Sequence, residues 1–281
     1  MAVRLDGKAL ADRIKAQVRE EAAALTRPPA LAVVLAGDDP ASQIYVRGKE
    51  RDCAECGIQS RTHRLRCDEA RRDLLPLIAS LNQDPAVDGI LVQLPLPEGL
   101  ESRAVLQAIA PEKDVDCFHP LNVGRMALGE PGFRPCTPAG LLALLDAYAI
   151  PIRGRHCVIL GRSNLVGRPL AQMLTARDGT VTLCHSRTEG LADLTRQADI
   201  LVCAVGQAGL VTADMVREGA VVLDVAMNRT PEGRLTGDAD FPAVEAKASF
   251  ITPVPGGAGP MTRAMLMRNV LAAAKGGDAA C

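Results

Sequence analysis

Short apolar runs alternate with amphipathic segments along most of the chain, and this alternation predicts an open, mostly parallel α/β sheet. The expected strands cover residues 30–35, 59–66, 89–94, 157–160, 180–184, 199–205, 221–225 and 250–252. The expected helices cover residues 6–25, 41–56, 68–82, 102–109, 137–148, 164–174 and 261–274. Asp68 and Thr137 are the expected caps of two of these helices. Residues 113–134 form a long irregular stretch, which is typical of a segment that lines a site.

The strand at 157–160 runs into a glycine turn that opens a helix. Gly161 ends the strand, and a second glycine follows at position 167, in the pattern G-x-S-x-x-x-G. A strand–turn–helix of this kind directs backbone N–H groups at an anion. By itself the pattern is weak evidence, because many tight turns of this kind bind nothing.

The next strand ends without the carboxylate that NAD-binding folds place there. The chain has His185, Ser186 and Arg187 at this point, and Arg162 lies in the preceding turn. Cations and hydroxyls suit a 2′-phosphate, so the sequence favours NADP over NAD. The alternative is that both arginines are solvated surface side chains.

These elements predict two lobes with an active-site cleft between them. Residues 1–139 are expected to form an open α/β sheet lobe that carries catalysis, completed by the C-terminal helix within 261–281. Residues 140–260 are expected to form a Rossmann-like lobe that binds NADP. Gly206 and Pro253 follow strand ends, where open α/β sheets bind their ligands.

The charge balance and the lack of a long apolar run narrow the class of protein. Lys and Arg total 32 against 33 Asp and Glu, for a net charge of −1, which argues against a nucleic-acid or membrane-surface protein. No apolar run approaches the roughly 20 residues of a membrane span, and the N-terminus has no signal-peptide core. We therefore expect a cytoplasmic protein.

The nine cysteines are scattered along the chain. Cys53 and Cys56 form a C-x-x-C late in a predicted helix, without the partners of a zinc site. Reduced structural thiols are therefore favoured over a redox pair, and no metal site is expected.

Lysine is rare in this chain, and arginine supplies most of the positive charge. Lys49 stands out because Tyr45 lies four residues earlier, on the same face of a predicted helix. A buried lysine loses its proton near neutral pH, which an arginine does not, so Lys49 is a candidate catalytic residue. The alternative is a surface lysine over a half-buried tyrosine.

Two further polar groups have both a structural and a functional interpretation. Gln93 is an amide near the carboxyl end of a buried strand, where it is either a satisfied core amide or a site residue. A second polar group comprises Asp114, Asp116 and His119, which lie close in sequence. They suggest a metal site, or an Asx-turn with a packed histidine, or a carboxylate that accepts two neighbouring N–H donors of an amidine-like heterocycle. The last is favoured, because no further cluster supports a metal.

Together these motifs resemble one family, the bifunctional methylenetetrahydrofolate dehydrogenase/methenyltetrahydrofolate cyclohydrolases of one-carbon metabolism. The matching stretches follow the family order and span nearly the whole chain: 40–49, 88–97, 113–120, 134–138, 161–169 and 252–262.

The resemblance implies a role for each matching position. Lys49 resembles the family's catalytic lysine, Gln93 the glutamine that positions it, Tyr45 the tyrosine that packs on the folate, and Asp116 the aspartate that binds the pterin. Further substrate contacts are implied at Val92, Leu94, Pro255, Gly256, Gly257, Pro260 and Thr262. NADP contacts are implied at Gly161, Arg162, Ser163, Ser186 and Met227, and the cationic pocket described above adds Arg187.

The resemblance also implies the reaction. NADP-dependent oxidation of 5,10-methylenetetrahydrofolate would give the 5,10-methenyl compound, and its hydrolysis would give 10-formyltetrahydrofolate. Such an enzyme serves purine, methionine and histidine biosynthesis and forms a homodimer. The alternative is a dehydrogenase with reduced or lost cyclohydrolase activity.

The family pattern is broken at three positions, where Cys117 and Ala226 replace Gly and Ala258 replaces Val. A side chain at position 117 can alter the local backbone angles or crowd the substrate. The substitutions at 226 and 258 affect fit more than chemistry.

Overall fold

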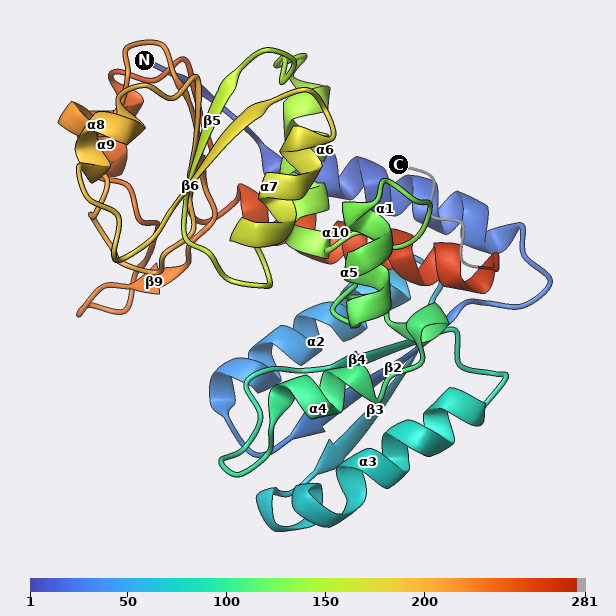
Figure 1. The fold of residues 1–281 in the computed structure, drawn as a ribbon. Coiled ribbons are helices and arrows are strands. Elements are labelled where there is room, and N and C mark those ends of the chain that lie inside the picture. Colours follow the sequence, from blue (N-terminus) through green and yellow to red (C-terminus); the bar gives the residue numbers. More distant parts are fainter. Residues whose placement is uncertain (277–281) are drawn as a thin grey trace. The chain divides into compact units, whose positions relative to one another are not determined.

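The computed structural model describes residues 1–276, which divide into two compact units (Figure 1). Unit 1 comprises Met1–Ala11 and Thr137–Thr262, and unit 2 comprises Asp12–Cys136 with the chain from Arg263 onward. The lobe boundaries drawn from the sequence stay a prediction. Residues 277–281 of the expected C-terminal segment lie outside the described residues.

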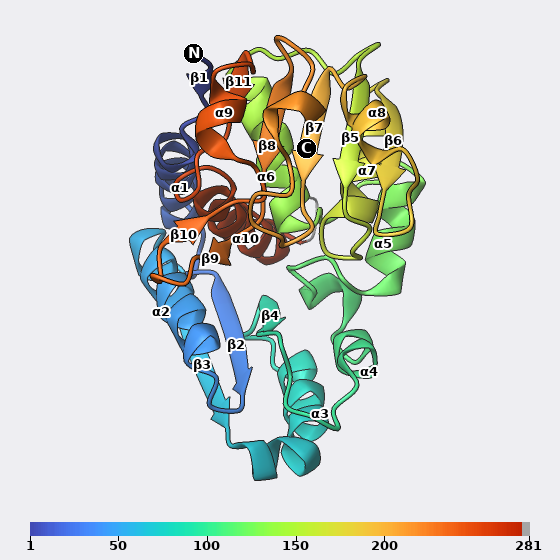
Figure 2. The ribbon, with the colours of Figure 1, turned by 90° about the vertical axis from the view of Figure 1, so that its left-hand side faces the viewer.

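Unit 2 is built on a three-stranded parallel sheet in the order β3-β2-β4. The central strand β2 (Ala30–Ala36) is buried along its whole length between β3 (Gln59–Leu65) and β4 (Gly89–Val92). A central parallel strand must be covered on both faces. Helices α2 (Pro40–Glu55) and α3 (Cys67–Gln83) supply this cover from opposite sides of the sheet (Figures 1 and 2).

One face of this sheet packs against α3. Ala32 and Val34 of β2 and Ile90 of β4 form a fully buried cluster with Leu74 and Ile78 of the helix. The alternation of positions 32 and 34 follows the two-residue period of a strand, and the spacing of 74 and 78 follows that of a helix.

The stretch 113–134 is less irregular than the sequence suggested. It contains α5 (Pro120–Ala127), and it follows α4 (Ser102–Gln107) and a 3-10 turn at Pro111–Lys113. The expectation of a wholly irregular segment was therefore wrong. His119 caps α5, because its Nδ1 accepts the Leu121 N–H at 3.1 Å, and apolar periodicity over so short a helix does not reveal it.

Unit 1 contains a parallel six-stranded sheet in the order β1-β11-β8-β7-β5-β6, and Figure 2 shows β8, β7, β5 and β6 side by side. Its strands are β1 (Val3–Arg4), β5 (His156–Leu160), β6 (Thr180–Cys184), β7 (Ile200–Cys203), β8 (Val221–Asp224) and β11 (Phe250–Ile251). The chain passes from β5 to β6 on one side and then returns to β7 on the other. The strand order therefore reverses between β5 and β7, which is the point where such sheets bind ligands.

Short helices and a hairpin complete this unit. They are α6 (Cys136–Ala147), α7 (Gly167–Thr175), α8 (Leu191–Thr195), a 3-10 turn (Ala213–Met215), the antiparallel pair β9 (Asn228–Arg229) and β10 (Leu235–Thr236), and α9 (Phe241–Glu245). Two long helices, α1 (Gly7–Ala23) and α10 (Ala258–Ala274), each contribute residues to both units. Every helix described among residues 1–276 is too short or too polar to span a lipid bilayer.

Two expected helix caps were wrong. Asp68 lies inside α3, whose N-cap is Arg66, and the Glu69 carboxylate accepts the Arg66 backbone N–H at 2.9 Å. Thr137 lies inside α6, and its hydroxyl is hydrogen-bonded to that of Thr262 at 2.9 Å. In both cases the helix begins earlier than the capping residue type suggested.

Candidate active site

The amine of Lys49 is hydrogen-bonded to the amide that the sequence singled out. Lys49 lies in α2, and its Nζ donates to Oε1 of Gln93 at 2.9 Å. Gln93 directly follows β4, and its own Nε2 donates to the Leu94 carbonyl at 2.6 Å. This second bond fixes the orientation of the amide, so its oxygen faces the lysine.

Burial and one carboxylate set the charge of this lysine. Burial lowers the pKa of Lys49, because the ammonium loses its hydration, while the negative charge of Asp116 opposes the shift. Burial likewise raises the pKa of Asp116, and the charge of Lys49 opposes that shift. Burial therefore biases the lysine toward an amine that accepts protons, while the charge of Asp116 limits this shift.

The two aspartates of the 113–120 stretch have different surroundings. Asp114 is 1% exposed and accepts two backbone N–H groups at 3.2 and 2.8 Å and the Asn122 amide at 2.9 Å. Within the described part of the chain, the carboxylate of Asp116 accepts only the thiol of Cys136, at 3.7 Å. Asp114 therefore shapes the backbone, as the Asx-turn alternative predicted, whereas Asp116 retains acceptor capacity for a ligand.

The histidine caps a helix, and the two cysteines of the C-x-x-C are buried. Across residues 1–276, no three His, Cys, Asp or Glu side chains lie close enough to hold a metal ion. Cys53 and Cys56 are free and buried, and burial raises the pKa of each thiol to about 12. Both are therefore protonated and unreactive at neutral pH, which supports the interpretation as structural thiols.

A buried ion-pair cluster holds the helix that carries Lys49. Asp52, one turn further along α2, is 1% exposed and pairs with Lys15 at 3.3 Å and Arg263 at 2.7 Å. Arg263 also lies against Gly48, where an added Cβ would come within 3.0 Å of its guanidinium. The sequence did not reveal this cluster, because its members come from three helices that are far apart in the chain.

The other residues predicted to bind folate are divided between the two units. Tyr45 lies one turn before Lys49 in α2 and is 44% exposed, and Val92 ends β4 beside Gln93 and Leu94. The predicted residues from Pro255 to Thr262 belong to unit 1.

The chain from Pro253 onward packs tightly against the start of α1. A Cβ on Gly7 would come within 1.9 Å of the Gly257 carbonyl oxygen, and the Lys8 N–H donates to Gly256 at 3.0 Å. Because α10 begins at Ala258, three residues before the predicted start, Pro260 and Thr262 lie within the helix and not in a loop.

Cys117 keeps the backbone conformation that glycine favours. Its φ is 61°, and its buried thiol donates to the Phe133 carbonyl at 3.2 Å. The substitution therefore leaves the backbone in the left-handed region and directs the side chain into the interior of unit 2.

The predicted cofactor residues of unit 1 lie at the carboxyl edge of its sheet. Gly161 follows β5, Ser186 and Arg187 follow β6, and Met227 follows β8. Gly161 has a φ of +114°, and a Cβ there would come within 2.2 Å of the Ala204 carbonyl oxygen. This close approach joins the ends of β5 and β7, where the strand order reverses.

The turn from Gly161 to Gly167 suits a phosphorylated dinucleotide. A Cβ on Gly167 would lie 1.8 Å from the Gly161 carbonyl oxygen, so the turn requires glycine at the start of α7. This helix has no side-chain N-cap, and Ser163 accepts the Val166 N–H at 3.1 Å. Arg162 and Arg187 are exposed, and neither guanidinium has an ion-pair partner within residues 1–276. A helix start with two unpaired cations fits the phosphates of NADP.

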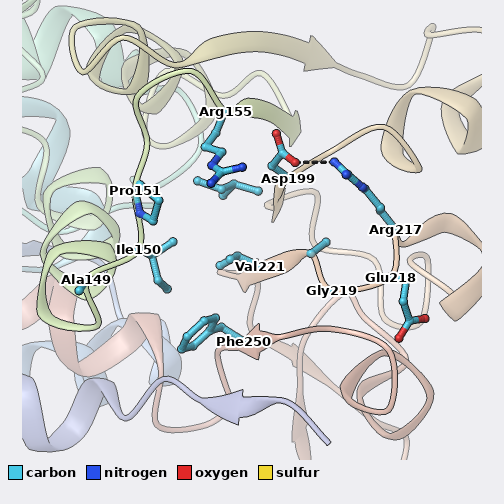
Figure 3. A pocket seen from close by; sticks show the side chains of 12 residues that line it. Ala149, Ile150, Pro151, Arg155, Asp199, Arg217, Glu218, Gly219, Val221 and Phe250 are labelled. Carbon is cyan, nitrogen blue, oxygen red and sulfur yellow. Dashed lines mark hydrogen bonds and ion pairs between the residues drawn. The ribbon is translucent and has the colours of Figure 1, made fainter.

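A separate cavity opens at the opposite edge of the same sheet (Figure 3). It has a volume of about 320 Å³ and is lined by the amino ends of β7, β8 and β11 and by Arg155, which precedes β5. The ion pair between Asp199 and Arg217 lies beside it. None of the predicted site residues lines this cavity, so it is distinct from the predicted cofactor site.

Comparison with known proteins assigns a family to both parts of the chain. The tetrahydrofolate dehydrogenase/cyclohydrolase catalytic domain matches residues 5–116, and the NAD(P)-binding domain of the same family matches residues 135–277. The chain belongs to the tetrahydrofolate dehydrogenase/cyclohydrolase family.

Individual relatives agree over nearly the full length. The bifunctional protein FolD of Moorella thermoacetica is 53% identical over 274 residues, which cover 96% of this chain and 98% of that relative. The crystal structure of FolD from Campylobacter jejuni has a TM-score of 0.96 and 48% identity, and the match covers 98% of this chain and 99% of that one. FolD from Trypanosoma brucei, complexed with NADP cofactor and inhibitor, has a TM-score of 0.93 and 39% identity, covering 98% and 97% of the two chains.

The family confirms the principal predictions from the sequence. The chain is a two-domain α/β enzyme that oxidises 5,10-methylenetetrahydrofolate with NADP and hydrolyses the methenyl product to 10-formyltetrahydrofolate. The dehydrogenase-only alternative is not favoured, because both family domains are present and the full-length relative is bifunctional.

We expect Arg162→Ala to weaken the use of NADP more than the use of NAD. Losing one charge-assisted bond to the 2′-phosphate raises the KM for NADP⁺ by roughly 10- to 100-fold and leaves that for NAD⁺ nearly unchanged. Steady-state kinetics with both cofactors measure the ratio, and Arg153→Ala, an exposed arginine paired with Asp178, is the control. An unchanged ratio in Arg162→Ala would place the 2′-phosphate elsewhere.

Proposed function

We propose that Lys49 moves the proton in the cyclohydrolase step, that Gln93 positions its amine, and that Tyr45 and Asp116 hold the folate. The observation that carries this proposal is the 2.9 Å bond from Lys49 Nζ to Gln93 Oε1, in surroundings that lower the pKa of the lysine. An oriented amine of lowered pKa is what a general base requires.

The two reactions place different demands on the protein. In the first, the methylene carbon of 5,10-methylenetetrahydrofolate loses a hydride and becomes the methenyl cation; NADP⁺, when bound, accepts that hydride. In the second, water adds to the methenyl carbon, the bond from that carbon to N5 breaks, and 10-formyltetrahydrofolate and a proton are released. Hydride transfer needs mainly alignment, whereas hydrolysis needs a group that moves protons.

A lysine of lowered pKa suits a cationic substrate. As a neutral amine, Lys49 takes a proton from the attacking water and passes it on as the ring opens. A permanently charged guanidinium at this position would repel the methenyl cation and has no free acceptor. Gln93 holds Nζ through its carbonyl oxygen, which leaves the nitrogen lone pair of the neutral amine directed elsewhere.

Asp116 binds the pterin through its carboxylate oxygens. A carboxylate accepts a pair of N–H donors from one heterocyclic edge, and within residues 1–276 the only donor to Asp116 is a weak thiol. Tyr45 packs its ring on the folate. The remaining contacts to the substrate come from Val92, Leu94, Pro255, Gly256, Gly257, Pro260 and Thr262.

The cofactor binds along the carboxyl edge of the unit 1 sheet. Gly161 and Ser163 hold the phosphates at the start of α7, Arg162, Ser186 and Arg187 bind the 2′-phosphate side, and the Met227 backbone contacts the nicotinamide end. The unpaired guanidinium groups and the glycine-dependent turn support this placement.

We also propose that the enzyme is a cytoplasmic homodimer that binds neither nucleic acid nor membrane. The near-zero net charge supports the absence of a nucleic-acid partner, and the family resemblance supports the dimer. Sedimentation equilibrium tests the dimer.

Lys49→Met is expected to separate the two activities. Cyclohydrolase activity should fall by about 10² or more, the loss typical of a positioned acid–base group, while NADP binding survives. Hydrolysis of added methenyltetrahydrofolate and the Kd for NADP measure the two effects. Lys275→Met is the control, because that lysine pairs with Glu21 on the surface. Equal retention of both activities in Lys49→Met would contradict the role.

Asp116→Asn and Asp114→Asn form a matched pair from one short segment. Asp116→Asn should raise the Kd for folate with little loss of stability, because its carboxylate supports almost no internal hydrogen bonding. Asp114→Asn should instead destabilise the fold by about 1–3 kcal/mol, since it loses acceptors for buried donors. Folate titration and denaturant unfolding measure the two quantities. If Asp116→Asn leaves the folate Kd unchanged, the pterin contact is wrong.

A further inference from the structure

Three consecutive backbone N–H groups after β7 converge on one buried carboxylate. Asp238, 0% exposed, accepts the Val205 N–H at 2.8 Å and the Gly206 N–H at 3.2 Å through Oδ2, and the Gln207 N–H at 2.7 Å through Oδ1. Successive N–H groups of this kind form a concavity that binds anions. Here an internal carboxylate fills the concavity, so these N–H groups are not available to a cofactor phosphate.

The same carboxylate also holds the loop that follows β8. Oδ1 of Asp238 accepts Nδ2 of Asn228 at 3.0 Å, and the same nitrogen lies 3.0 Å from the Gly237 carbonyl oxygen. Asn228 directly follows Met227, so one side chain connects the chain at 205–207 with the chain at 227–228. Both segments lie at the carboxyl edge of the sheet. The chain at 205–207 follows β7, where the strand order reverses, and the chain at 227–228 follows the neighbouring strand β8.

A second buried carboxylate fixes Asp238 itself. Asp224 ends β8, is 2% exposed, and accepts the backbone N–H groups of Asp238 at 3.0 Å and Ala239 at 2.8 Å. Burial raises the pKa of Asp224 to about 6, so it is ionised at neutral pH and accepts through both oxygens. A Cβ on Gly237 would come within 2.0 Å of its Oδ2, so glycine is required for this approach.

We propose that Asp238 is a positioning residue for the dehydrogenase step: through the loops after β7 and β8, it fixes the backbone that borders the nicotinamide half of NADP. The inference rests on the proposed cofactor site at the carboxyl edge of this sheet. Asp238 acts only through these loops and does not touch the adenosine phosphates, which the turn at 161–167 holds. Its loss therefore changes one half of the cofactor site and leaves the other half intact.

Asp238→Asn is the direct test, because it keeps the shape and removes acceptors. An amide has one acceptor oxygen, so whichever way it points, at least two of the four donors face its NH₂ group. We expect dehydrogenase kcat/KM for NADP⁺ to fall about tenfold or more. Hydrolysis of added methenyltetrahydrofolate, measured without NADP, should stay within about twofold. Asp240→Asn, an exposed aspartate two residues along, is the matched control.

Binding of adenosine 2′,5′-bisphosphate, which lacks the nicotinamide, separates positioning from general damage. It should bind Asp238→Asn as tightly as the unaltered enzyme. An equal loss of affinity for the bisphosphate and for NADP⁺, an equal fall of both activities, or an unchanged dehydrogenase would each overturn the proposal. Failure of the unaltered enzyme to bind the bisphosphate would instead count against the proposed cofactor site.

If Asp238→Asn does not fold, Asn228→Ala provides the second test. It removes only the amide link between the two loops and leaves the three N–H bonds to Asp238 in place. We expect a smaller fall in dehydrogenase kcat/KM, by about threefold to tenfold, with unchanged cyclohydrolase and bisphosphate binding. Equal dehydrogenase activity in Asn228→Ala and the unaltered enzyme would overturn the proposal.

Discussion

A lysine amine withdrawn from water and hydrogen-bonded to an amide oxygen is the interaction on which the proposed chemistry depends. Burial disfavours the ammonium and lowers the pKa of Lys49, which favours the neutral form that accepts protons. The surrounding elements serve this one group. The segment after β4 delivers Gln93 Oε1 to within 2.9 Å, and Asp52 anchors α2 through Lys15 and Arg263. The negative charge of Asp116 limits how far the pKa of Lys49 falls. In our proposal, the carboxylate of Asp116 also binds the pterin.

Buried carboxylates organise the rest of both units, and most of them do so without taking part in chemistry. Asp114 collects backbone and amide donors in unit 2, and Asp224 and Asp238 do the same in unit 1. A buried charge is tolerated when each oxygen receives donors, because the donors replace the lost hydration. Asp116 departs from this rule, since within the described residues its donor is a thiol. That difference, more than burial or charge alone, distinguishes a site aspartate from a structural one.

The sequence predicted the elements and the family well because these depend on local patterns. Hydrophobic patterns predicted the strands of both sheets to within a few residues, except the two-residue β1, and the missing carboxylate after β6 indicated NADP. Features that depend on distant contacts were not predictable. Arg263 meets Asp52, and Asp238 meets the chain at 205–207, through the tertiary fold alone. Short elements also escaped detection, as α5 and the two misplaced caps show, because one or two turns carry too little periodicity. The site roles themselves stay predictions.

Following NADPH and the methenyl intermediate separately, at two wavelengths, tests the central claim most directly. The purified enzyme would receive methylenetetrahydrofolate and NADP⁺, with a no-enzyme control for spontaneous hydrolysis of the intermediate. The account predicts that NADPH rises while little methenyl compound accumulates, because one enzyme performs oxidation and hydrolysis in succession. Stoichiometric build-up of the methenyl compound alongside NADPH would contradict it and indicate a dehydrogenase alone.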